Sequence, residues 1–75
     1  MSKLPQLTAV ELIKILFSLG FKALRQEGSH IFLRQSDGRT TVIPNHPGRK
    51  LDQGLLNKII RKDIQISRED FMKIV

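Results

Sequence analysis

The sequence predicts an α+β fold in which a helix, three antiparallel strands and a second helix follow one another, with a short helix at the end. Three patterns lead to this prediction: helical periodicity over residues 9–19, alternating and β-branched residues over 21–43, and a second helical pattern over 53–62. Both longer helices would cover one face of the three-stranded sheet. Because the chain has 75 residues, we expect residues 1–75 to form one domain with a small core.

The first helix is predicted from its capping residues and its apolar surface. Thr8 and Glu11 have the spacing of a capping box, which places the start of the helix at about Ala9. Gly20 can adopt the left-handed conformation that ends a helix, so the helix should finish near Leu19. The apolar arc of this helix is wider than one sheet face needs. Core packing, a second helix or another chain could cover it.

Three strands are predicted over residues 21–27, 29–35 and 39–43. Asp37-Gly38 lies between the last two and tolerates the positive φ angles of a tight turn. The third strand is rich in β-branched residues, and Pro44 closes it. Strict alternation in the first strand would place Phe21, Ala23 and Arg25 on one face and Lys22, Leu24 and Gln26 on the other.

After a loop with a basic end, Asp52 can cap the second helix, which we expect over residues 53–62. Ser67 can cap a last short helix anchored by Phe71 and Ile74. The apolar positions of the second helix predict its buried face, and its basic positions predict its exposed face. The buried face would comprise Leu55, Leu56, Ile59 and Ile60, and the exposed face Lys58, Arg61 and Lys62.

Composition limits the classes of ligand and compartment. Thirteen Lys and Arg against seven Asp and Glu give a net charge of +6, which favours a polyanion: nucleic acid first, an acidic membrane second, or an acidic protein. The absence of cysteine excludes disulfides and thiolate metal sites and agrees with a reducing cytoplasm. Glu11 and Lys14 interrupt the N-terminal apolar segment, so we expect no membrane span and no secretory signal, hence a cytoplasmic protein.

The main catalytic candidate is His30, because an imidazole ordinarily titrates near neutral pH. On a strand, the period of two places His30, Phe32 and Arg34 on one face and leaves Ile31 and Leu33 for the core. An imidazole can take the proton of a ribose 2′-hydroxyl, which then attacks the adjacent phosphorus without metal or cofactor. Arg34 could stabilise the charge that builds on the phosphate. A solvated strand histidine is the simpler interpretation.

Other residues are candidates for support or RNA binding. Phe32 could stack on an unpaired base, or it could face the core or a partner. His46 could be a second acid, a phosphate contact or a solvated loop residue, and two histidines alone fall short of a zinc site. Ser29 could bond the backbone or orient His30. The remaining candidates supply backbone freedom or positive charge on strands and loop ends: Gly28, Lys22, Arg25, Arg34, Arg39, Arg49 and Lys50.

The motifs of the chain also occur together in a known order. They are Leu19-Gly20-Phe21, Arg25 to His30, Asp37-Gly38-Arg39, Val42 to Gly48, Leu51 with Gly54-Leu55-Leu56, and Ile66 to Phe71. This ordered set, which covers nearly the whole chain, resembles the HicA toxin family of small bacterial and archaeal mRNA interferases. Residues 61–65 depart from the Lys-Gln-Ala-Gly link that is common in the family, which leaves the path of this connection open.

The resemblance implies a double-stranded-RNA-binding-domain-like fold and the role of toxin in a type II toxin–antitoxin system. It further implies metal-independent endoribonuclease activity on mRNA, with His30 at the position of the family's catalytic histidine and His46 at a second recurring position. A HicB-type antitoxin would cover the catalytic histidine. Two other hypotheses remain: a non-catalytic RNA-binding module with the same basic face, and an interaction domain whose apolar arc docks a partner helix.

Overall fold

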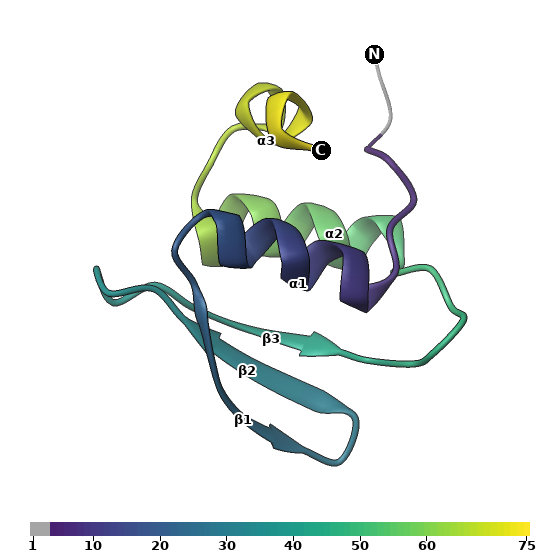
Figure 1. Ribbon diagram of the computed structural model, residues 1–75. Helices are drawn as coiled ribbons and strands as arrows, with labels where there is room; N and C mark the ends of the chain where they lie inside the picture. Colours follow the sequence, from purple (N-terminus) through teal and green to yellow (C-terminus); the bar gives the residue numbers. More distant parts are fainter. Residues whose placement is uncertain (1–3) are drawn as a thin grey trace.

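An open, three-stranded antiparallel sheet carries a layer of helices on one face in the computed structural model, which describes residues 4–75 (Figure 1). The elements are α1 (Ala9–Ser18), β1 (Lys22–Glu27), β2 (His30–Arg34), β3 (Thr40–Pro44), α2 (Gln53–Lys58), η1 (Ile59–Ile64) and α3 (Arg68–Ile74). Helix α1 lies beside α2, and α3 lies on the side of these helices that faces away from the sheet (Figure 1). This arrangement confirms the predicted α+β, double-stranded-RNA-binding-domain-like order.

Helix α1 begins and ends where its capping residues predict. The Thr8 side chain accepts a hydrogen bond from the Glu11 amide, and the Glu11 carboxylate accepts one from the Thr8 amide. The Thr8 backbone hydrogen bond is the largest cause that lowers the pKa of the Glu11 carboxyl, and the Thr8 hydroxyl and the Lys50 charge add to it. Gly20 follows the helix with φ 92°, which a residue with a side chain rarely adopts.

The core lies between the sheet and the helix layer. Leu12 and Leu16 of α1 meet Leu33 and Ile43 of the sheet in one cluster of buried side chains. Val10 and Phe17 of α1 stay half exposed, so the described chain covers only part of the wide apolar arc. Within residues 4–75, no helix has both the length and the apolar character needed to cross a membrane.

A bulge in β1 changes the faces that simple alternation predicts. Ala23 pairs with Leu33, but the next pair is Arg25 with Phe32, so Leu24 is an extra residue in β1. The prediction that Ala23 and Arg25 share a face is therefore wrong. Because of the bulge, the Arg25 side chain lies on the same face of the sheet as Phe32.

The second helix is not a single α-helix over residues 53–62 as predicted. Asp52 caps it through the amides of Gly54 and Leu55, but α2 ends at Lys58 and passes directly into the π-helical turn η1. Gln65 then adopts a left-handed conformation with φ 62°. The chain therefore leaves the helix two residues later than predicted, at Ile64 rather than Lys62, within the segment that departs from the family's usual link. The expected apolar face is otherwise present: Leu56, Ile59 and Ile60 are buried, Ile64 joins them, and Leu55 packs against the core at its margin.

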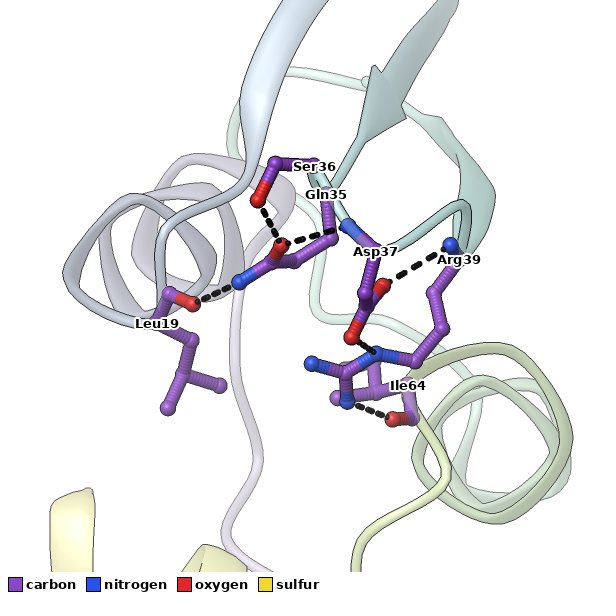
Figure 2. A network of polar contacts seen from close by, with 6 residues as sticks. All are labelled: Leu19, Gln35, Ser36, Asp37, Arg39 and Ile64. Atoms are coloured by element: carbon purple, nitrogen blue, oxygen red, sulfur yellow. Dashed lines mark hydrogen bonds and ion pairs between the residues drawn. The ribbon is translucent and has the colours of Figure 1, made fainter.

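The turn between β2 and β3 is tied to the ends of both helices (Figure 2). The Gln35 side-chain amide donates to the Leu19 carbonyl at 2.9 Å. The Arg39 guanidinium donates to the Ile64 carbonyl and pairs with Asp37 at 2.8 Å. These bonds satisfy carbonyls that the helix ends would leave without partners. The same hydrogen bonds hold this end of the sheet against the helix layer.

Helix α3 contributes one large side chain to the core. Ser67 caps it by accepting from the Asp70 amide at 3.0 Å. Phe71 is completely buried, as predicted, but Ile74 is 40% exposed and does not anchor the helix. A helix this short has two turns, and only one of its apolar positions faces the core.

Candidate active site on the sheet

The face of the sheet that the helices leave free carries the candidate catalytic residues. Alternation in β2 and β3 turns Leu33, Thr41 and Ile43 inward, where all three are buried. The strand register then places the neighbouring positions on the other side. We call this side the outer face; it comprises Lys22, Arg25 and Glu27 of β1, His30, Phe32 and Arg34 of β2, and Thr40, Val42 and Pro44 of β3.

His30 is the first residue of β2 and is exposed to solvent. Gly28 and Ser29 form a two-residue turn before it, in which Gly28 has φ 60°. In this register His30 lies opposite Glu27 on one side and Pro44 on the other. The imidazole therefore lies at the end of the central strand of the sheet, on the face that is open to solvent.

Ser29 contributes its backbone to the structure at the start of β2. Its carbonyl accepts a hydrogen bond from the Asn45 amide at 2.6 Å. This bond fastens the turn before His30 to the loop that follows β3. The predicted alternative in which Ser29 bonds through its backbone is therefore present, and a role of its hydroxyl in orienting His30 stays a prediction.

Arg25, Phe32 and Glu27 form a contact group next to His30. The Arg25 guanidinium carbon lies 4.1 Å from the centroid of the Phe32 ring, and its Nε donates to the Glu27 carboxylate. Phe32 is therefore half-buried under Arg25 rather than open on both faces. The sequence interpretation missed Glu27. A two-residue turn at Gly28-Ser29 would have placed it opposite His30.

At the other end of the outer face, Lys22 lies directly opposite Arg34. Like charges in opposite positions of a sheet repel each other, and a bound anion would relieve this repulsion. Arg34 is four residues from His30, which is roughly 13 Å along an extended strand. The outer face thus carries His30 at one end, the cations Lys22 and Arg34 at the other and Arg25 between them, so a chain of phosphates could lie along it.

The loop after β3 brings further basic residues to the end of the sheet that carries His30. His46, Arg49 and Lys50 line a hollow of about 200 Å³ together with Pro44, the cross-strand partner of His30. Lys50 also lies 3.6 Å from the Glu11 carboxylate. The structure therefore brings His46, Arg49 and Lys50 to the same end of the sheet as His30.

Arg39 does not belong with the other candidates. It precedes β3 at the end of the sheet remote from His30, and its guanidinium bonds Asp37 and Ile64 and lies 5.4 Å from the Phe21 ring centroid. These contacts give Arg39 a structural role within the fold, and the RNA contact that the sequence suggested for it stays a prediction. Within residues 4–75, no group of three or more His, Cys, Asp or Glu side chains is arranged to hold a metal ion.

Comparison with known protein families gives a match over most of the chain. A family model described as HicA toxin of bacterial toxin-antitoxin matches residues 9–66, which run from the start of α1 to the segment after η1. A search of curated proteins gave no match. The matched range includes the whole outer face and the loop that carries His46, whereas α3 lies beyond it.

Proposed function

Because the chain belongs to the HicA toxin family and is the toxin of a toxin–antitoxin system, we propose that it is an endoribonuclease that cleaves mRNA at the outer face of its sheet. The observation that carries this proposal is the exposed His30 imidazole on a face that also presents Lys22, Arg25 and Arg34. Cations on a solvent-exposed strand face can bind phosphates without reading base sequence. The imidazole adds a group that can move protons.

In the proposed reaction, His30 acts as a general base and acid on the RNA backbone. The imidazole takes the proton from a ribose 2′-hydroxyl, and the 2′-oxygen attacks the adjacent phosphorus. The bond from phosphorus to the 5′-oxygen of the next nucleotide breaks, and this oxygen takes the proton that the His30 imidazole has gained. The products are a 2′,3′-cyclic phosphate and a 5′-hydroxyl. Arg25, which lies two positions from His30 in the register of the outer face, would stabilise the negative charge that develops on this phosphate, and Arg34, at the other end of the face, would bind a neighbouring phosphate.

The toxin's partner is an antitoxin, and we propose that it is of the HicB type and covers the outer face. An antitoxin that contacts His30, Arg34 and Lys22 would both bury the imidazole and occupy the phosphate-binding cations. Acidic side chains on the antitoxin would complement the net charge of +6. Neutralisation would then follow from direct exclusion of RNA.

Incubating the purified protein with single-stranded RNA in excess chelator tests the proposed activity. We expect cleavage to continue, because the proposed proton transfers use only an imidazole and the ribose hydroxyl. RNA that is bound in a salt-dependent manner but stays intact would contradict the nuclease and favour a non-catalytic RNA-binding module. Failure to bind RNA even at low salt would contradict both and leave the interaction domain.

A further inference from the structure

The side of the second helix that faces away from the sheet carries a second group of cations. Arg61 and Lys62 follow Lys58 by about one turn, and all three are exposed, while Ile59 and Ile60 of the same segment are buried. Like charges at this spacing repel each other along a helix. An anionic ligand would relieve this repulsion.

Two adjoining hollows open beside these cations. The larger has a volume of about 560 Å³ and is lined by Asn57, Arg61, Gln65, Ile66, Ser67 and Arg68. The smaller, of about 280 Å³, shares Asn57 and Arg61 and adds Gly54, Lys58 and Lys62. Because Asn57 and Arg61 line both, the two hollows lie next to each other, and we call them together the helix-side groove.

The geometry of the helix end creates this groove. The chain leaves η1 through the left-handed Gln65, and the Ile66 amide bonds back to the Ile60 carbonyl at 3.1 Å. This reversal brings Ser67, at the start of α3, beside Asn57 and Arg61 of the preceding helix. An α-helix that ended at Lys62, as the sequence pattern predicts, would not place these residues together.

Charge and side-chain chemistry select the ligand. The residues that line the helix-side groove, all within the described chain, include no Asp or Glu. The nearby Asp63 carboxylate accepts from the Thr41 hydroxyl at 3.0 Å, on the sheet side of η1. The groove therefore presents cations, the side-chain amides of Asn57 and Gln65, and the single aliphatic side chain of Ile66. Such a lining can bind phosphate oxygens better than it can bind an apolar protein surface.

We propose that the helix-side groove is a second binding site for the phosphate backbone of RNA, centred on Arg61 and Lys62. The groove is lined by the second helix and the start of α3, which lie on the helix side of the sheet, whereas the outer face is the side of the sheet that the helices leave free (Figure 1). The extents of the molecule are 35 × 30 × 18 Å. One RNA chain could pass from His30 around the edge of the molecule to the groove. The proposal rests on the proposed function only in its choice of RNA as the ligand. Because one RNA chain would occupy both sites, the preferred substrate would be a long, extended strand.

The test compares RNA affinity in a His30→Ala background, which keeps the RNA intact during the measurement. Adding Arg61→Gln and Lys62→Gln is expected to raise the Kd of a single strand of about 20 nucleotides roughly tenfold and to lower its salt slope by about 1.4. A strand of about 5 nucleotides, which can occupy the outer face alone, should keep its Kd. Fluorescence anisotropy at several salt concentrations measures both values.

A matched control separates a local contact from the loss of net charge. Lys14→Gln with Lys73→Gln removes the same charge from exposed positions outside the groove, and it should change the Kd of the long strand less than twofold. The proposal would be overturned if the two pairs of substitutions raised the Kd of the long strand equally, or if the groove pair did not raise it. An acidic protein would then be the remaining candidate ligand of the groove. Equal weakening of short and long strands would also overturn the proposal.

Two further measurements keep the outcome unambiguous. Circular dichroism checks that the protein with Arg61→Gln and Lys62→Gln is folded. If it is not, the single exposed change Lys58→Gln replaces the pair. It is expected to raise the Kd of the long strand two- to fivefold, and an unchanged Kd would contradict the proposal. Because binding is measured without cleavage, the groove can be confirmed even if wild-type protein leaves RNA intact. Conversely, cleavage by His30 can stand if the groove fails.

Discussion

His30→Ala is expected to lower the rate of RNA cleavage about 10²–10⁴-fold, the usual contribution of a positioned general acid or base. The substitution removes the exposed imidazole at the start of β2 and leaves the cations that would bind phosphate in place. RNA affinity should therefore change little while turnover is lost. Single-turnover cleavage of labelled RNA and anisotropy binding measure the two effects separately.

Two controls accompany this prediction. His46→Ala removes the other histidine, at the loop beside Pro44, and should lower the rate less than His30→Ala because the His46 position does not lie on a strand of the outer face. Thermal denaturation of both variants should match the wild type, since both side chains are exposed. A folded His30→Ala protein that cleaves RNA at the wild-type rate, or that arrests growth when expressed without antitoxin, would refute the catalytic role of His30.

Phe71→Ala is expected to destabilise the protein by about 3–5 kcal/mol, the usual cost of deleting a buried phenylalanine. Phe71 is 0% exposed and fixes α3 onto the helix layer, although it lies beyond the residues that match the family model. A domain of this size has an unfolding free energy on the order of 5–10 kcal/mol, so the expected loss is a large fraction of the total stability. Urea denaturation followed by circular dichroism measures the change.

Met72→Ala is the matched control for this prediction. Met72 is the next residue of α3 but is 38% exposed, so its truncation should change the unfolding free energy by less than about 1 kcal/mol. Similar midpoints for Phe71→Ala and the wild type would show that α3 is not part of the cooperative core. Equal losses in the two variants would show that the helix, rather than the Phe71 ring, contributes the stability.

Much of the fold could be predicted because the signals are local. The Thr8–Glu11 box, Asp52 and Ser67 each cap the helix that they precede, and Gly20 ends α1 as expected. Alternation in β2 correctly placed Leu33 inside and His30 outside. These features depend on hydrogen bonds within a few residues or on the two-residue period of one strand.

The features that could not be predicted depend on contacts between distant segments. The bulge at Leu24 arises from the pairing of β1 with β2, and it alone decides that Arg25 reaches Phe32. The π-helical turn η1 likewise contacts a distant segment, since its Asp63 carboxylate accepts a hydrogen bond from the Thr41 hydroxyl of β3. Arg39 has the charge of an RNA contact, yet its guanidinium bonds the Ile64 carbonyl, which becomes available only once the helix has ended there. No sequence pattern specifies these partners.

The central claim, attack of a ribose 2′-hydroxyl on its own phosphate beside His30, can be tested by changing one atom of the substrate. A cleavage site is first mapped in an RNA strand, and the 2′-hydroxyl at that nucleotide is then replaced by hydrogen. We predict that the wild-type protein binds the modified strand as tightly as the parent but no longer cuts it at that position, while the parent yields a 2′,3′-cyclic phosphate and a 5′-hydroxyl. Cleavage at the modified position would contradict the account, because the nucleophile would then be water rather than the ribose.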